Sequence, residues 1–159
     1  MDTATMWLAA SAVFTGIWSG LLTQTTMVLH PMMRAQDGPT YARQMEMLLR
    51  TTRKAPAKFC VIGLVVAPAG ALATIYAAGD RSTAFLLTGI GLGATIVGAL
   101  LVPNFLAVPN YDRILAWDPE HLPEGWEAVR SRYFALNWAR AAFAWTAFGV
   151  LMAGLVRRA

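Results

Sequence analysis

One side of the last apolar segment carries side chains that could bind an anion. An indole, a phenol, an amide and two guanidinium groups follow one another there at spacings of 4, 3, 4 and 3 residues: Trp126, Arg130, Tyr133, Asn137 and Arg140. Spacings of three and four place side chains on one face of a helix. Most of these groups donate hydrogen bonds, and a guanidinium binds carboxylates and other anions. The face therefore predicts a site for a negatively charged group.

Arg140 is the member of this face that is hardest to place in a membrane. It lies about two helical turns inside the last apolar segment if that segment begins at Tyr133. At the centre of a bilayer an arginine costs about 2.5–3.5 kcal/mol on insertion scales. The side chain could extend to the headgroups, or it could turn inward to a ligand or to Asp112, the nearest acid in the expected topology. Both alternatives stay open.

A second polar face lies on the first apolar segment. Its members are spaced 4, 4, 4, 3 and 4 residues apart: Ser11, Thr15, Ser19, Thr23, Thr26 and His30. Small hydroxylated residues let membrane helices approach closely, so most of this face is explained by packing. His30 differs, because an imidazole titrates near neutral pH. Two Gly-x-x-x-Gly pairs, Gly16 with Gly20 and Gly89 with Gly93, are also typical of close packing and permit a homo-oligomer.

The tripeptide Val-Pro-Asn occurs twice at the end of the third apolar segment. Pro103 and Pro109 each lack an N–H group, so they interrupt regular helix there. Irregular backbone at membrane depth needs protein or a wet cavity beside it. The nearby polar residues Asn104, Asn110 and Asp112 are therefore candidates for lining a cavity, although an ordinary helix end would give the same pattern.

Metal binding is not favoured by the ligand types and their spacing. The two histidines, His30 and His121, form no His-x-x-x-His pair, and Cys60 is the single cysteine, which excludes an intrachain disulfide. Methionines 27, 32 and 33 near His30 would suit copper or haem, but no motif supports such a site. We expect no metal or cofactor, and we expect Cys60 to be a buried thiol.

The composition is that of an integral membrane protein of a single domain, residues 1–159. The chain is 57% hydrophobic and 14% charged, whereas soluble proteins have about 25% charged residues. Four runs are long enough to cross a bilayer: 5–29, 58–78, 83–108 and 133–156. The first run is preceded by Asp2 and by no Lys or Arg, so it does not resemble a signal peptide. The sequence predicts an all-α, four-helix transmembrane bundle.

The basic residues predict the orientation of this bundle. Nine Lys and Arg residues fall in or beside the two long loops, against three on the opposite side, which predicts cytoplasmic loops in a bacterial plasma membrane. In the first loop Tyr41, Met45, Leu48 and Leu49 recur at helical spacing among basic residues. This loop is either an amphipathic helix at the membrane surface or a simple hairpin. Pro123 and Glu124 suit the start of the last helix. We find no nucleic-acid-binding motif.

Several of these features resemble the anthrone oxygenase-like family of small membrane proteins. The likeness rests on four spans, a glycine-bearing first span that ends in HPMM, a Pro-Asn element after span three, and Asn-x-x-Arg in span four. The positions that match the family motifs are Pro31 after span one, Pro109, Asn110 and Leu115 after span three, and Asn137 with Arg140 in span four. Asn110 follows Pro109 without the family's spacer, and Tyr133 stands where Trp is usual.

The resemblance implies a cofactor-independent monooxygenase that oxidises a lipophilic aromatic, an anthrone, through its enolate and O2. His30 would be the base, because its ordinary pKa lies near 6.5. Arg140, Asn137 and Asn110 would stabilise the enolate oxygen, and the aromatic residues Tyr133 and Trp126 would stack on the substrate. Arg130, Asn104 and Asp112 complete the expected substrate contacts.

Two other classes of function are compatible with membrane helices. A non-catalytic protein that binds a lipid or another hydrophobic ligand, or an accessory subunit of a membrane complex, would use the same donor face for an anionic headgroup. A transporter or channel is disfavoured, because no acidic residue lies within a span and inverted repeats are not evident.

Overall fold

The fold is all-helical in the part of the chain that the structure describes. A computed structural model gives the backbone of residues 1–54 and 57–158 and the side chains of 1–52 and 61–158. The helical elements in chain order are α1 (Thr3–Gln24), the π-helical turn η1 (Thr25–Leu29), α2 (His30–Arg34), α3 (Gly38–Lys54), α4 (Ala57–Ala77), α5 (Thr83–Ile96), the π-helical η2 (Val97–Ala107), α6 (Val108–Leu115) and α7 (Trp126–Val156). The side chain of Cys60, expected as a buried thiol, lies outside the described residues.

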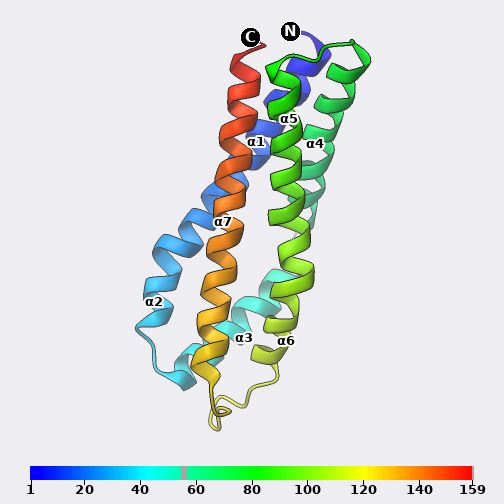
Figure 1. The fold of residues 1–159 in the computed structure, drawn as a ribbon. Helices are drawn as coiled ribbons and strands as arrows, with labels where there is room; N and C mark the ends of the chain where they lie inside the picture. Colours follow the sequence, from blue (N-terminus) through cyan, green and yellow to red (C-terminus); the bar gives the residue numbers. More distant parts are fainter. Residues whose placement is uncertain (55–56, 159) are drawn as a thin grey trace.

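Long helical segments run side by side along the molecule, and several elements join end to end to form them (Figure 1). Within the described residues three segments are long and apolar enough to cross a membrane: Thr3–Arg34, Thr83–Leu115 and Trp126–Val156, of 32, 33 and 31 residues. In α4 the stretch Val61–Ala77 is apolar but shorter. The predicted all-helical class and the membrane-compatible helices are thus confirmed.

Both long connections lie at the same end of the bundle, as the sequence predicts. The chain termini and the short α4–α5 connection lie together at one end, whereas both long connections lie at the other (Figure 1). At the first end Arg158 donates to Asp80 at 2.6 Å and to Asp2 at 3.1 Å. Hydrogen bonds from Thr5, and then from Arg158, lower the pKa of Asp2 to about 2. Arg158 is therefore neutralised locally, which explains a basic residue at this end.

The polar face of α1 points into the bundle. Of its members Ser11, Thr15, Ser19, Thr26 and His30 are buried. The hydroxyl groups donate mostly to carbonyl oxygens one turn earlier in the same helix, as Thr15 does to Ser11 at 2.7 Å. Thr23 in addition accepts a hydrogen bond from the Trp145 indole at 2.8 Å, which links α1 to α7. Since these bonds satisfy polar groups inside an apolar bundle, packing accounts for most of the face.

The closest helix approaches do not occur at the glycine pairs that the sequence suggests. A Cβ atom on Gly98 in η2 would lie 2.6 Å from Cβ of Phe143 on α7, and one on Gly91 would lie 2.6 Å from Cγ of Leu151. A Cβ on Gly20 or Gly93 would meet no atom within 4 Å. Gly91 in α5 and Gly98 in η2 thus set how closely the α5–η2 segment approaches α7.

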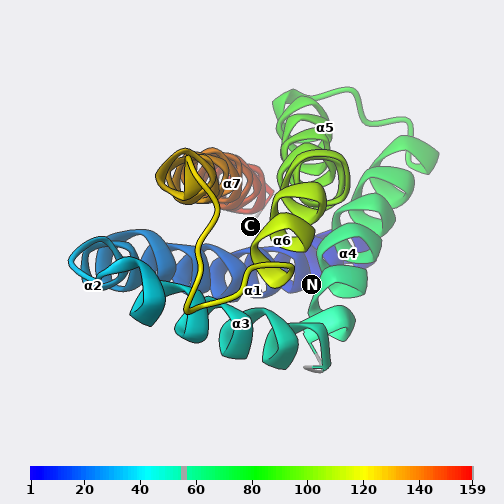
Figure 2. The same ribbon diagram turned by 90° about the horizontal axis from the view of Figure 1, so that it is seen from below.

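The helix in the first long connection packs against the protein rather than lying free on a membrane surface. α3 runs crosswise between α2 and α4 at the end of the bundle (Figure 2). Its residues Tyr41, Met45 and Leu49 are buried in one cluster with Ile114, Tyr133 and Phe134. Of the two alternatives left open for this loop, the structure has the helix, and the bundle covers most of its apolar face. The last helix begins at Trp126, after Gly125 in a left-handed conformation (φ 77°), and not at Pro123 as expected.

Replacing Gly98 by alanine is expected to destabilise the bundle, because the new methyl group cannot fit beside Phe143 unless the helices separate. Overpacking of this kind costs about 1–3 kcal/mol. The matched control is Gly93→Ala, on the same helical segment, where the methyl group has space and glycine is the weaker helix former. Thermal unfolding in mild detergent should show a lower Tm for Gly98→Ala alone. An equal Tm for the two variants would contradict this packing.

Candidate functional site

A group of polar and aromatic side chains gathers toward the end with the long connections. We call His30, Tyr111, Tyr133, Asn137 and Arg140 the polar cluster. The ring of Tyr133 lies between the rings of His30 and Tyr111, with centroid distances of 5.7 and 5.9 Å. His30, Tyr133 and Asn137 are buried. The structure therefore brings the predicted base and three residues of the α7 face into one region and adds Tyr111.

The Arg140 guanidinium is held by neutral acceptors. Its Nη1 donates to the Tyr111 hydroxyl at 3.2 Å and to Asn137 Oδ1 at 3.0 Å, and its Cζ lies 5.7 Å from the centroid of the Trp18 ring. The inward orientation considered from the sequence is thus observed. The sequence suggests Asp112 as an alternative partner, but the ion pairs between described side chains do not include Arg140 with Asp112. Asp112 is exposed.

His30 is a buried imidazole whose nitrogen atoms have no hydrogen-bond partner in the described part of the protein. Its side chain packs against α7, with its centroid 4.6 Å from that of Phe134, and the residue is 2% exposed. A buried polar atom left without a partner costs about 1–3 kcal/mol. His30 therefore keeps hydrogen-bonding capacity that the described residues do not use.

An open groove beside His30 is large enough for a ligand. Its volume is about 420 Å³, and it is lined by Thr26, His30, Pro31, Arg34, Ala35 and Trp138. We call it the His30 groove. Its lining residues come from η1, α2 and the residue after α2, and from α7. These two parts of the chain diverge toward the end with the long connections (Figure 1). Ligand pockets commonly measure about 300–1,000 Å³, so this groove could hold a small aromatic molecule or part of a lipid.

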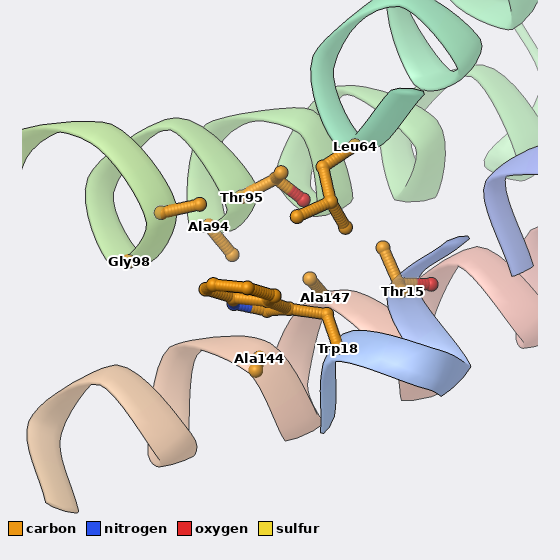
Figure 3. Close-up of a pocket in the computed structure, with 9 residues that line it drawn as sticks. Thr15, Trp18, Leu64, Ala94, Thr95, Gly98, Ala144 and Ala147 are labelled. Carbon is orange, nitrogen blue, oxygen red and sulfur yellow. The ribbon is translucent and has the colours of Figure 1, made fainter. Parts of the chain in front are cut away.

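The centre of the bundle offers far less space. A cavity there has a volume of about 10 Å³, which corresponds to about one water molecule. The Trp18 ring occupies the space between small residues of the other helices, including Ala94, Gly98 and Ala144 (Figure 3). A substrate-sized guest therefore fits the His30 groove and not this cavity.

The two asparagines after the prolines lie in different environments. Asn110 is buried, and its Nδ2 donates to the carbonyl oxygen of Val129 on α7 at 3.2 Å. Asn104 is exposed and donates to the carbonyl oxygen of Leu100 in the preceding turn at 2.7 Å. Asn110 thus joins α6 to α7, whereas Asn104 lies apart from the polar cluster.

Trp126 and Arg130 belong to an aromatic group under α3, which Tyr41 connects to Tyr133 and Phe134. The Arg130 Cζ lies 4.5 Å from the Trp126 ring centroid and 5.6 Å from that of Tyr41. Its Nη1 also donates to the carbonyl oxygen of Gln36 at 3.3 Å. Burial raises the pKa of Tyr41 well above its usual value, so its phenol stays neutral. These contacts hold α3 against the start of α7 and place both residues away from the His30 groove.

Some residues of the site could not be chosen from the sequence. Arg34 follows His30 by one helical turn, but it looked like one of many basic loop residues. Trp138 lies on a different side of α7 from the face that carries Tyr133 and Arg140. Tyr111 is adjacent in sequence to Asp112, the acid expected near Arg140. Only the 4-residue spacing of His30 and Arg34 could have indicated the groove.

Metal ligands do not gather at the site. The described side chains include no group of three or more His, Cys, Asp or Glu residues that could hold a metal ion. His121 is exposed in the connection between α6 and α7, where its Nδ1 lies 3.1 Å from Asp118 Oδ2. It has no part in the polar cluster.

Comparison with known proteins finds no match for this chain. No protein-family model matches this chain, and neither a curated protein nor a solved structure does. Function is therefore argued from the residues of the polar cluster and the His30 groove.

Replacing Tyr111 by phenylalanine should destabilise the protein, because the Arg140 guanidinium loses an acceptor in an apolar environment. Hydrogen bonds to charged groups contribute about 1.5–3 kcal/mol. Tyr76→Phe is the matched control, since Tyr76 is exposed. Denaturation in detergent should give a lower free energy of unfolding for Tyr111→Phe than for Tyr76→Phe. Equal values would show that the Tyr111 hydroxyl does not hold Arg140.

Proposed function

We propose that α4 is a fourth span, so that four helical segments cross a bacterial plasma membrane with both long connections in the cytoplasm. The three long apolar segments and the apolar stretch Val61–Ala77 support four crossings. The two chain termini lie at one end of the bundle and both long connections lie at the other, as four crossings require (Figure 1). Nine of the thirteen Lys and Arg residues lie in or beside these connections, and such residues are enriched on the cytoplasmic side.

Within this membrane protein, the His30 groove takes up a lipophilic aromatic of the anthrone type, which is oxygenated without metal or flavin. The observation that carries this proposal is that His30, whose buried imidazole has no hydrogen-bond partner, is a lining residue of a groove of ligand size. The imidazole must turn toward the groove to reach a substrate. Arg34 and Trp138 line the same groove and supply a cation and an indole. A substrate dissolved in the bilayer can enter sideways, because the groove opens between helices that would face lipid.

His30 is the base in this reaction. A neutral imidazole removes a proton from the acidic CH2 group of the anthrone, and the electron pair of the C–H bond becomes the enolate. The enolate carbon transfers an electron to O2, and combination of the two radicals forms a C–O bond. The imidazolium returns its proton to give a hydroperoxide. Loss of the remaining hydrogen with cleavage of the O–O bond releases water and leaves the quinone, so one O2 is consumed per substrate.

The enolate oxygen requires a positively charged donor beside it. The family resemblance implies this role for Arg140, Asn137 and Asn110. We assign it to Arg34, because Arg34 lines the His30 groove, whereas Arg140 is not among its lining residues and donates to Tyr111. Arg140 and Asn137 then keep the wall of the site in place.

His30→Gln and Arg34→Met should each lower oxygen uptake with an anthrone by about 100-fold or more, the usual contribution of a general base. The matched control is Arg132→Met, which removes an exposed arginine of α7 outside the groove. Uptake is measured with an oxygen electrode on protein purified in mild detergent. Equal loss in all three variants, or full activity of His30→Gln, would contradict the proposed site.

The non-catalytic alternative has its own expected result. Mass spectrometry of co-purified ligands, together with an absorption spectrum for haem, flavin or copper, shows what the purified protein carries. An anthrone that binds in the groove without any oxygen uptake would replace the oxygenase with a protein that binds hydrophobic ligands.

A further inference from the structure

The charge of Arg34 is not balanced by the protein. Arg34 is exposed at the end of α2, and it forms no ion pair with any other described side chain. Its contact is with an aromatic ring, since its Cζ lies 5.3 Å from the Phe134 centroid. In contrast Arg43 pairs with Glu120, and Arg158 pairs with two aspartates. The His30 groove therefore presents a guanidinium whose donors are available to an anion.

The remaining walls of the groove suit the boundary between headgroups and acyl chains. Trp138 is 41% exposed on α7, and an indole is favoured at a membrane interface. The same helical path as His30 and Arg34 exposes the apolar side chains of Met27, Val28 and Met32. A cation at the end of an apolar helical surface matches a molecule with an anionic head and long hydrocarbon chains. A free inorganic anion would leave that apolar surface unused.

His30 lies beneath the wall of the groove and offers a second polar contact once its side chain turns outward. Both ring nitrogens lack partners and are buried, so a lipid hydroxyl that donates to one, or an ester or phosphate oxygen that accepts from the other, reaches them only after that rotation. A phospholipid with a glycerol headgroup carries hydroxyl groups, ester oxygens and a phosphate in one molecule. A choline headgroup lacks the hydroxyl groups and adds a positive charge near Arg34.

From these contacts we propose that an anionic phospholipid of the cytoplasmic leaflet occupies the His30 groove, with its phosphate on Arg34. Anionic lipids are abundant on that side of the membrane, where the basic end of the bundle is proposed to lie. If the groove is also the substrate site, which rests on the proposed function, this lipid competes with the aromatic substrate. Anionic membranes then raise the KM for the anthrone and leave kcat unchanged.

The test is lipid retention by the full-length protein in nanodiscs that contain equal amounts of phosphatidylglycerol and phosphatidylcholine with identical acyl chains. After transfer to detergent, native mass spectrometry identifies the lipids that stay bound. The wild type should prefer phosphatidylglycerol by about fivefold, as about 1 kcal/mol for one basic residue implies. Arg34→Met should lose this preference, Arg34→Lys should keep part of it, and Arg132→Met should match the wild type.

Three results would overturn the proposal: equal retention of both lipids by the wild type, equal losses in Arg34→Met and Arg132→Met, or displacement of the lipid by millimolar inorganic phosphate alone. The last result would assign the site to a free anion. Because no substrate is present, the outcome is independent of oxygenase activity. A protein that retains the lipid but never consumes oxygen would contradict the proposed function only.

Discussion

Polar groups inside the helical bundle must find their partners within the protein, because the apolar helices and any surrounding lipid offer none. The hydroxyl groups of α1 meet this requirement by bonding to carbonyl oxygens of their own helix. The Trp145 indole meets it by donating to Thr23. Arg140 meets it with the Tyr111 hydroxyl and the Asn137 amide, which are neutral but lie on different elements. The position of α6 against α7 depends on these bonds.

Several buried polar atoms of the described residues are exceptions to this rule, among them the Trp18 indole nitrogen, the Tyr41 hydroxyl and Arg140 Nε. His30 differs from these residues because both of its ring nitrogens lack a partner and it lines a groove, and the fold explains where it lies. At the end with the termini, Arg158 and two aspartates hold the connections together. At the opposite end the α1–α2 segment diverges from α7 (Figure 1). Residues of these two segments line the His30 groove. An unpartnered imidazole and an unpaired guanidinium therefore occur together where the bundle is open, which is the arrangement expected of a ligand site.

The sequence predicts the features that repeat along a helix. The apolar runs predict the long helices, and the spacing of Ser11, Thr15 and Ser19 predicts which side of α1 is buried. The spacing of Tyr133 and Asn137 does the same for α7. Helical periodicity fixes which residues share a face, so it predicts burial without knowledge of the neighbouring helix.

Contacts between elements could not be predicted in the same way. Tyr111 and Asp112 are adjacent in the sequence, and only the rotation of α6 decides that the phenol reaches Arg140. Gly98 and Gly93 are equally small, but Phe143 faces only the first. The apolar face of α3 could have rested on lipid, and its burial depends on where α6 and α7 end. Each of these outcomes depends on the relative placement of two helices. The spacing of residues along one helix does not determine that placement.

The most direct test of the central claim is the distance from the Arg140 guanidinium to the lipid phosphates. Solid-state NMR of arginine-labelled protein in bilayers can measure dipolar coupling between guanidinium nitrogen and phosphorus, and Arg140→Leu identifies the signal. We expect no coupling to phosphorus for Arg140, and we expect its signal to shift in Tyr111→Phe. Strong coupling to phosphorus would mean that Arg140 extends to the headgroups, and the polar cluster described here would not exist in the membrane.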